Sequence, residues 1–502
     1  MTSPPPRRAG AGRPYRGGAR KGPAGPPRRP PTLRPPIDDP ARQAALDLLA
    51  AVRSRGAYAN LALPPILRDR RIGGRDAALA TELAYGSCRA LGQLDAVITA
   101  CGDRPFAELD GEVIDALRLG AYQLLHTRIP PHAAVSSTVE LVRAGDRACA
   151  AGYVNAVLRR IAEADLDTWV QRLAPPAEQD RLGHLAMATA HPRWIVSALA
   201  DRLAPDSNTV MATTTATATA SNTNTDTATD ELEKALRADD VPPTVHLVAR
   251  PGLIGRDELV TASGGTPAQY SPYGVYLHGT DPGRVSAVAD GRAAVQDEGS
   301  QLVATALATA TLDGPDERWL DLAAGPGGKA GLLGAFAAGR GAHLDAVEIG
   351  PHRADLVRRT TAGLPVTVHT ADGRASGLDE DAYDRVLLDA PCTGLGALRR
   401  RPESRWRRTP SDVPELVELQ QELLAAAARH VRVGGLIAYV TCSPHLAETL
   451  GVVGRRPDQL ELCDARPFLP GVPALGDGPT VQLWPHRQGT DGMFLALLRR
   501  TG

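Results

Sequence analysis

The chain has 502 residues, of which 43% are hydrophobic, and a net charge of −1. This length allows about two to four domains, and no apolar run is long enough to span a bilayer. The N-terminus lacks the apolar core of a secretory signal, so we expect a cytoplasmic protein with no membrane partner. The six cysteines form no C-x-x-C pair, which argues against a metal cluster and a disulfide framework.

Residues 1–37 form an arm that is rich in Pro, Gly and Arg. Its first 36 residues hold eight Arg, one Lys and no acid, so the rest of the chain carries about −10. Such a composition buries too little apolar surface to fold and predicts disorder. A basic arm on an acidic body suggests a polyanionic partner, and a solubilising tail is the open alternative.

Residues 38–172 show apolar residues at helical spacing. Asp38 and Asp39 are possible caps for the first helix, and few alternating β-branched runs interrupt the pattern. The sequence therefore predicts an all-helical domain. The helical stretches are ARQAALDLLAAVRSRGAYANLAL, RDAALATELAYGSCRALGQLDAVITAC, GEVIDALRLGAYQLLHT, HAAVSSTVELVRAGD and GYVNAVLRRIAEA.

Residues 173–290 are more mixed and are interpreted as a small α/β subdomain. Two short runs resemble strands, TVHLVAR (244–250) and GVYLHG (274–279). Before them lies a Thr/Ala tract, about residues 208–230, with no amphipathic period. We interpret this tract as a disordered insertion without a chemical role.

Residues 291–502 alternate between strand and helix patterns, which predicts an α/β domain with a mostly parallel sheet covered on both faces. Ligands in such sheets bind beyond the carboxyl ends of the strands, so the informative residues follow each strand. The expected strands are RWLDLAA (318–324), HLDAVEI (343–349), VTVHTAD (366–372), DRVLLDA (384–390), GGLIAYVTC (434–442) and FLALLRR (494–500).

A glycine-rich loop follows the first expected strand and allows close backbone approach to a ligand. Ala323 and Ala330 occupy positions where a phosphate-binding P-loop needs Gly and Ser or Thr, and Ala330 also breaks the dinucleotide-binding pattern. The loop residues are Ala323, Ala324, Gly325, Pro326, Gly327, Gly328 and Lys329.

Three acids end the next three expected strands. Glu348 is placed to bond ribose hydroxyls, Asp372 could bond an adenine amino group, and Asp389 follows at the fourth strand. Each alone could be a solvated loop carboxylate. Together with the glycine loop they predict a nucleoside-type cofactor site.

Two cysteines follow strands at the same predicted edge, Cys392 in DAPCTG and Cys442 in TCSPH. A thiolate is a nucleophile when nearby cations or helix dipoles lower its pKa. A basic run follows Cys392 and suggests nucleic-acid binding, with a solvated helix face as the alternative. Its residues are Arg399, Arg400, Arg401, Arg405, Trp406, Arg407 and Arg408.

The motifs DLAAGPGGK, DAPCTG and TCSPH, with VQDEGSQLVA (295–304), resemble the Sun-type family of RNA (cytosine-5) methyltransferases. The stretches YGSCRALGQLD and GYVNAVLRR resemble the NusB-like RNA-binding domain of RsmB-type enzymes in that family. The resemblance covers about residues 38–205 and 240–502. It implies a multidomain fold: an all-α NusB-like domain, a small α+β linking subdomain and a Rossmann-like methyltransferase domain.

The resemblance also implies S-adenosyl-L-methionine as cofactor and RNA, most of all small-subunit ribosomal RNA, as partner of a monomer. It places residues 323–329 beside the methionine part, Glu348 and Arg353 at the ribose and Asp372 at the adenine. Asp389 lies near the methionine and the target base. Cys442 matches the family's nucleophile, and Cys392 matches the cysteine that assists product release.

Three alternatives stay open. DNA cytosine-5 methyltransferases use a Pro-Cys at this strand end, so Cys392 could be the nucleophile. The substrate could be tRNA. The chain could also be an RNA-binding or antitermination module with an inactive methyltransferase domain.

Overall fold

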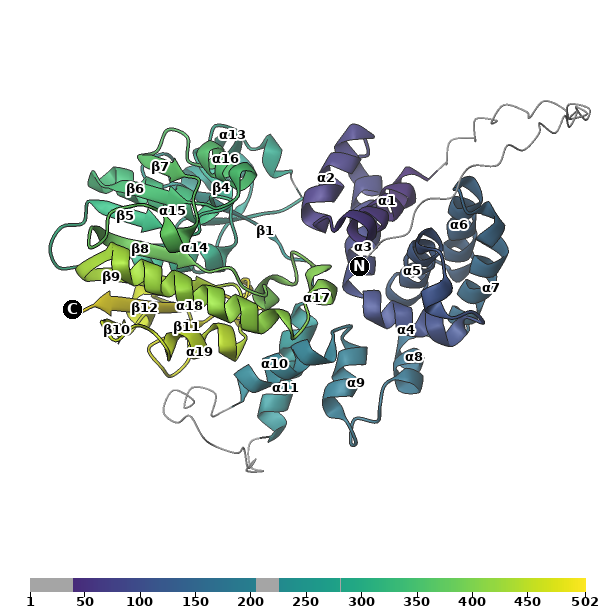
Figure 1. Ribbon diagram of the computed structural model, residues 1–502. Coiled ribbons are helices and arrows are strands. Elements are labelled where there is room, and N and C mark those ends of the chain that lie inside the picture. Colours follow the sequence, from purple (N-terminus) through teal and green to yellow (C-terminus); the bar gives the residue numbers. More distant parts are fainter. Residues whose placement is uncertain (1–38, 205–224, 280) are drawn as a thin grey trace, which may run out of the picture.

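The computed structural model describes residues 39–204, 225–279 and 281–502 (Figure 1). The expected basic arm lies outside the described residues, as does most of the Thr/Ala tract. The described chain is a helical N-terminal part, a linking part with a small sheet, and an α/β part with a large sheet. No helix among the described residues is long and apolar enough to cross a membrane.

The N-terminal part is helical, as predicted. Asp39 caps the first helix through the backbone N–H of Arg42, and Gly56 ends it in the left-handed conformation. Leu48, Leu83 and Leu117 are fully buried where helices α1, α3 and α5 meet. The helices are α1 (Pro40–Arg55), α2 (Ala59–Asp69), α3 (Gly74–Arg89), α4 (Leu91–Cys101), α5 (Gly111–His126), α6 (Pro131–Ala144), α7 (Ala151–Ile161) and α8 (Leu166–Leu173).

Three helices open the linking part: α9 (Arg181–Ala188), α10 (Arg193–Leu203) and α11 (Thr225–Ala238). Helix α11 corrects the expectation of disorder for residues 225–230. Its later turns carry Leu232, Ala235 and Leu236, which are buried in a cluster with α10. An amphipathic run thus begins before the Thr/Ala tract ends, and packing of its apolar face stabilises the helix.

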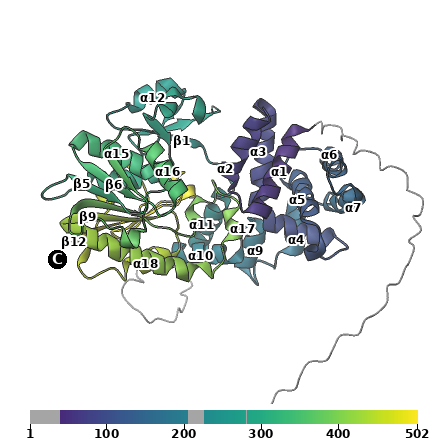
Figure 2. The ribbon, with the colours of Figure 1, turned by 45° about the horizontal axis from the view of Figure 1, so that its top comes forward.

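A four-stranded antiparallel sheet completes the linking part, in the order β2-β3-β1-β4. It contains both strands that the sequence predicted. Figure 2 shows β1 and α12 at the side of the large sheet. The elements are β1 (Val245–Ala249), α12 (Arg256–Ser263), β2 (Thr266–Pro267), β3 (Gly274–Leu277), α13 (Ser286–Ala289) and β4 (Ala293–Val295).

The C-terminal part contains an eight-stranded mixed sheet in the order β10-β12-β9-β8-β5-β6-β7, with β11 paired to β12. Strands β5 to β9 are mutually parallel, and β12 runs antiparallel to its neighbours. The strands are β5 (Arg318–Asp321), β6 (His343–Val347), β7 (Val366–His369), β8 (Tyr383–Asp389), β9 (Val431–Thr441), β10 (Leu460–Cys463), β11 (Val481–Gln482) and β12 (Phe494–Arg500).

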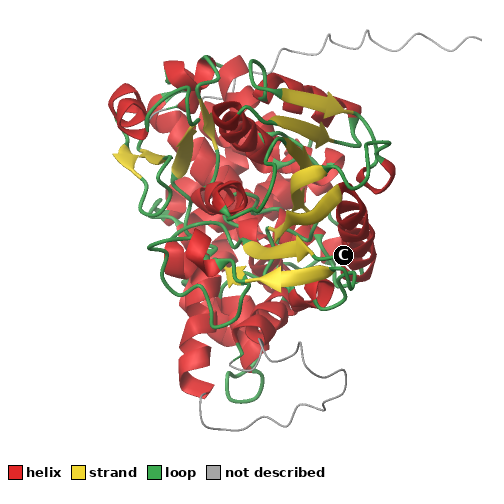
Figure 3. Cartoon of the chain, turned by 90° about the vertical axis from the view of Figure 1, so that its left-hand side faces the viewer, coloured by secondary structure: helices red, strands yellow, loops and turns green. Residues whose placement is uncertain are grey.

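Helices cover both faces of this sheet, as Figure 3 shows. Side chains alternate along each strand, so Leu387 enters the core under α14 (Glu298–Thr309) and α15 (Gly328–Arg340). Val386 and Leu388 enter the opposite core, under α18 (Asp412–His430). The predicted α/β architecture is confirmed.

A short helix, α17 (Ser404–Arg407), joins the three parts. The side chain of Arg405 is fully buried and bonds the carbonyls of Ala190 and Asp239 and the carboxylate of Asp240. Trp406 Nε1 donates to the carbonyl of Arg89 at 2.9 Å. The helical part is therefore held against the α/β part by polar bonds buried at the contact.

The Trp406 ring predicts the outcome of one glycine substitution. Gly92 is the second residue of α4, and a Cβ there would overlap the ring. We expect Gly92→Ala to destabilise the chain by about 1–3 kcal/mol because the ring must move. The measurement is the midpoint of urea denaturation followed by tryptophan fluorescence.

Gly152→Ala is the matched control. Gly152 is the second residue of α7, another helix of 11 residues, and a Cβ there meets nothing within 4 Å. Alanine there should leave stability unchanged or raise it by up to about 1 kcal/mol. Equal effects of the two substitutions would contradict the close contact of α17 with α4.

Candidate active site

The sheet has one position where the strand order reverses. From β5 the chain proceeds outward to β6 and β7, then returns to β8 on the other side of β5. Loops after β5 and β8 therefore diverge and leave a crevice at their carboxyl ends. The glycine loop follows β5, Asp389 ends β8, and Cys442 directly follows the neighbouring strand β9. The structure brings these predicted site residues to one edge.

The glycine loop offers bare backbone at this edge. The backbone N–H of Gly325 donates to Glu348 Oε2 at 3.1 Å, and a Cβ at Gly325 would overlap that carboxylate. Gly327 has φ 109°, a left-handed value that favours glycine, and α15 begins at the next residue. The loop thus directs the N-terminus of α15 at the crevice, where N–H groups attract negative charge.

Glu348 and Arg353 lie together beside the loop. Glu348 is 4% exposed and also accepts from the backbone N–H of Gly350 at 2.9 Å. Arg353 Nη2 lies 3.4 Å from Glu348 Oε2 and donates to the carbonyl of Gly325 at 2.6 Å. The exposed Arg353 side chain covers a buried acid, an arrangement that suits recognition of neighbouring hydroxyl groups.

Asp372 follows β7, as predicted, and its carboxylate is hydrogen-bonded to Arg374. Arg374 donates to both of its carboxylate oxygens, with Nη2 to Oδ2 at 2.6 Å. These hydrogen bonds lower the pKa of Asp372. The side chain remains a hydrogen-bond acceptor at the rim of the crevice.

Lys329 and Asp389 form an ion pair, with Nζ 2.8 Å from Oδ2. Asp321 is the last residue of β5, and the charges of Asp389 and Lys329 both act on its carboxylate. Burial and the charge of Asp389 raise the pKa of Asp321 to about 7. Its Oδ2 atom is buried and has no hydrogen-bond partner.

Sequence reasoning missed Asp321, although its signal was present. The residue is the first letter of DLAAGPGG and ends β5, as Asp389 ends β8, while Glu348 and Asp372 follow β6 and β7. An acid with an orphaned oxygen and a raised pKa marks a functional position. A cationic ligand group beside the loop would satisfy that oxygen.

The two cysteines are in direct contact. Cys392 Sγ lies 3.4 Å from Cys442 Sγ, although 50 residues separate them. The hydrogen bond between the thiols lowers the pKa of Cys442, and the charges of Lys329 and Arg401 act in the same direction. The same bond and burial raise the pKa of Cys392. Cys442 is therefore the more acidic thiol of the pair.

The basic run after Cys392 differs from the expected RNA surface. Arg399 and Arg405 are buried, and Trp406 packs on α4. Arg407 donates to the carbonyl of Ala57 in the helical part. The interpretation of these side chains as RNA contacts is corrected: most of the run holds the protein's parts together. Arg401 is exposed, and Arg408 is half-buried.

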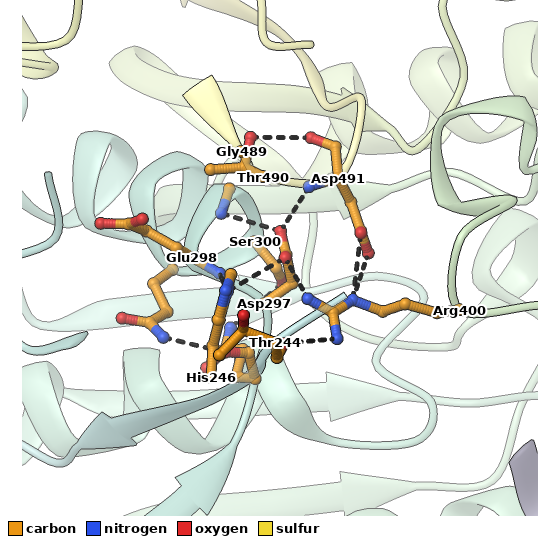
Figure 4. A network of polar contacts seen from close by, with 12 residues as sticks. Thr244, His246, Asp297, Glu298, Ser300, Arg400, Gly489, Thr490 and Asp491 are labelled. Atoms are coloured by element: carbon orange, nitrogen blue, oxygen red, sulfur yellow. Dashed lines mark hydrogen bonds and ion pairs between the residues drawn. The ribbon is translucent and has the colours of Figure 1, made fainter. Parts of the chain in front are cut away.

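Arg400 also has a structural role, in the network of Figure 4. Its guanidinium lies 2.7 Å from Asp297 and 3.0 Å from Asp491, and Asp297 also lies 3.3 Å from His246. His246 is in β1, so the network joins the linking sheet to the α/β part. Because the Arg400 guanidinium is paired with two buried acids, it is not available for the RNA contact that the sequence predicted.

Comparisons with known proteins identify the class. A model of the 16S rRNA methyltransferase RsmB/F family matches residues 309–499, and a model of the NusB family matches residues 39–163. The chain is similar in fold to the crystal structure of PH0851, with a TM-score of 0.72 and 21% identity over 92% of this chain and 99% of that one.

Relatives that match this chain over nearly their whole length are also named as methyltransferases. "Putative methyltransferase Rv1407" of Mycobacterium tuberculosis (strain H37Rv) is 54% identical, covering 92% of this chain and 97% of the relative. "Ribosomal RNA small subunit methyltransferase B" of Pseudomonas putida is 33% identical, covering 91% and 98%. The chain belongs to the RsmB/F family of rRNA methyltransferases, with a NusB domain at its N-terminal side. Enzymes of this family depend on S-adenosylmethionine.

The raised pKa of Asp321 predicts pH-dependent cofactor binding. The carboxylate is protonated below about pH 7 and ionised above it. We expect the affinity for S-adenosylmethionine, whose methionine part carries an ammonium group, to rise between pH 6 and pH 8, spanning about one unit either side of that value. Calorimetric titration across this range measures it.

Asp321→Asn should bind more weakly at pH 8 and lose this rise, because the amide does not ionise. Asp316→Asn serves as the control, since Asp316 is an acid that bonds Arg385 in the same domain but away from the loop. A pH profile that is unchanged in Asp321→Asn would remove Asp321 from the cofactor site.

Proposed function

We propose that this chain transfers a methyl group from S-adenosylmethionine to carbon 5 of a cytosine in small-subunit (16S) ribosomal RNA, through a covalent bond between Cys442 and the cytosine. The observation that carries the proposal is the thiol pair: Cys442 Sγ lies 3.4 Å from Cys392 Sγ, and Cys442 is the thiol whose pKa is lowered. A nearby cysteine thiolate is what addition to a pyrimidine requires.

The residues at the crevice fit the cofactor. The bare loop of residues 323–329 admits a ligand against the backbone, and the orphaned Oδ2 of Asp321 suits an ammonium group. Glu348 and Arg353 would hold the ribose, and Asp372 would accept from the adenine amino group. When bound, S-adenosylmethionine supplies an electrophilic methyl group.

Covalent addition overcomes the low nucleophilicity of carbon 5. Cys442 Sγ adds to carbon 6, and the electron pair of the 5,6 double bond moves toward N3, which makes carbon 5 enamine-like. Asp389, protonated in the desolvated complex, stabilises the developing charge by donating a hydrogen bond to N3. After methylation, the carbon-5 proton is removed, the double bond re-forms, and Cys442 leaves as the thiolate.

Cys392 assists the release of the product. A hydrogen bond already joins its thiol to Cys442 Sγ, and as the donor it stabilises negative charge on that sulfur when the carbon–sulfur bond breaks. The target cytosine must leave its stack to reach this half-buried pair. For the RNA strand, the exposed Arg401 and the half-buried Arg408 are the members of the basic run that remain available.

The two cysteines predict opposite outcomes in the same assay. Cys442→Ala should abolish methylation and leave no covalent RNA adduct. Cys392→Ala should lower turnover but accumulate an adduct, because addition proceeds and release is slow. Methyl transfer from labelled cofactor and denaturing gel shifts of labelled RNA measure the two steps.

Cys463→Ala is the matched control, since Cys463 ends the outer strand β10 and lies away from the pair. It should methylate normally. An adduct that survives Cys442→Ala but disappears in Cys392→Ala would make Cys392 the nucleophile.

The substrate is tested in cells that lack the protein. Bisulfite sequencing of their rRNA should show the loss of a single cytosine mark in the small subunit, restored by the wild-type chain but not by Cys442→Ala. Loss of marks from tRNA alone would favour a tRNA enzyme. No lost mark, together with no cofactor binding, would favour an inactive RNA-binding module.

A further inference from the structure

Glu448 lies behind both cysteines and belongs to neither motif. It ends the short 3-10 helix η7 (Leu446–Glu448), six residues after Cys442, and its side chain is fully buried. Its Oε1 accepts from the backbone N–H of Thr393 at 2.7 Å, and its Oε2 accepts from Thr393 Oγ1 at 2.5 Å. Ser443 Oγ also donates to Oε2, at 2.6 Å.

These bonds join the residue after Cys392 to the residue after Cys442. A fourth donor, Gln420 Nε2 of α18, reaches Oε1 at 3.2 Å and also bonds the carbonyl of Pro391. One carboxylate thus closes the two loops against each other. The 3.4 Å contact between the sulfur atoms depends on this closure.

The four donors are all uncharged groups. A buried carboxylate held only by neutral donors is costly, because the donors do not cancel its charge. A glutamine would satisfy much of the same hydrogen bonding at lower cost. The negative charge of the buried Glu448 carboxylate therefore requires a functional explanation.

We propose that Glu448 is a positioning residue that distinguishes the two thiols: its carboxylate clamps their loops together, and its negative charge keeps the proton on Cys392. Cys392 then remains the donor, and Cys442 is free to attack. This inference rests on the proposed role of Cys442 as the nucleophile, but its test requires neither RNA nor cofactor.

The other charged groups around the two thiols support this difference between Cys392 and Cys442. Asp389 raises the pKa of both thiols, so it does not distinguish them. Lys329 and Arg401 act on Cys442 and lower its pKa. Glu448 acts on Cys392, after the thiol hydrogen bond and burial, and raises its pKa.

Two further titratable groups face Glu448. Tyr439 of β9 donates its hydroxyl to the Glu448 carbonyl at 2.7 Å, and its pKa is raised by burial and by the charges of Cys392 and Glu448. Burial lowers the pKa of His445, so this ring is neutral at pH 7 and supplies no compensating cation. The carboxylate of Glu448 is thus the uncompensated charge on the Cys392 side.

The test is site-resolved alkylation of the purified full-length chain, without RNA or cofactor. Brief iodoacetamide pulses from pH 6 to pH 10, followed by peptide mass spectrometry, give the initial labelling rate of each cysteine. Cys149, exposed in the helical part, is the internal rate standard. In the wild type, Cys442 should label first and at lower pH than Cys392.

Glu448→Gln keeps the size and most of the bonds but removes the charge. We expect the ratio of Cys442 to Cys392 labelling to fall about tenfold at neutral pH, which corresponds to a change of one pKa unit. Glu448→Asp, which retains the charge, should restore most of the ratio. A wild-type ratio and pH profile in Glu448→Gln would overturn the proposal.

Glu298→Gln is the matched control. Glu298 is another fully buried carboxylate that accepts from neutral donors, the backbone N–H groups of Tyr270 and Ser271 and the hydroxyl of Tyr276. It lies in the network of Figure 4, away from the thiols. Its loss should affect stability without changing the labelling ratio, and an equal change in both variants would reduce Glu448 to a structural role.

Variants that lack one cysteine of the pair test the proposal without altering Glu448. Cys442→Ala leaves Cys392 alone in the site, and Cys392→Ala leaves Cys442 alone. We expect the lone Cys392 to label with a higher midpoint pH than the lone Cys442. The reverse order would overturn the inference even if Glu448→Gln did not fold. Loss of methylation with normal labelling would instead count against the proposed function alone.

Discussion

The reversal of strand order between β5 and β8 is the constraint on which the site depends. It makes the loops after these strands diverge, and the candidate residues of the site lie at strand ends of this edge or in the loops and first helical turns that follow them. The parallel ladder between β8 and β9 then places Asp389 opposite Val440, so the two cysteine loops start side by side. Strand register thus brings the two cysteine loops together, and the Glu448 carboxylate then closes them against each other.

The charges at this edge are arranged so that chemically similar groups behave differently. Asp321 and Asp389 are neighbouring carboxylates, but Lys329 pairs with Asp389, and Asp321 is left to carry a proton near neutrality. Cys392 and Cys442 are separated in the same way by their surroundings. When the surroundings push the pKa values of two identical side chains apart, one of them can act as the proton donor and the other as the acceptor.

The sequence was sufficient for six of the sheet's eight strands, all but β10 and β11, and for the strand-end residues, because alternation of strand and helix fixes which residues meet at the edge. It missed Asp321, whose importance lies in burial and an unsatisfied oxygen, neither of which a sequence displays. It also misjudged α11, where an amphipathic run is joined to a low-complexity tract. Glu448 escaped notice because its role requires two loops, 50 residues apart, to close on one carboxylate.

The basic run after Cys392 shows most clearly why composition alone misleads. Arginines beside a cofactor site suggest nucleic acid, yet Arg405 is 0% exposed and bonds two carbonyls and an acid of the linking part. The guanidinium has five donors in a rigid fork, which makes it as suited to joining buried chain segments as to binding phosphates. Because this run begins seven residues after Cys392, the bonds that hold the helical part in place also anchor one cysteine loop. The docking of the helical part and the geometry of the thiols are thus set by one segment of the chain.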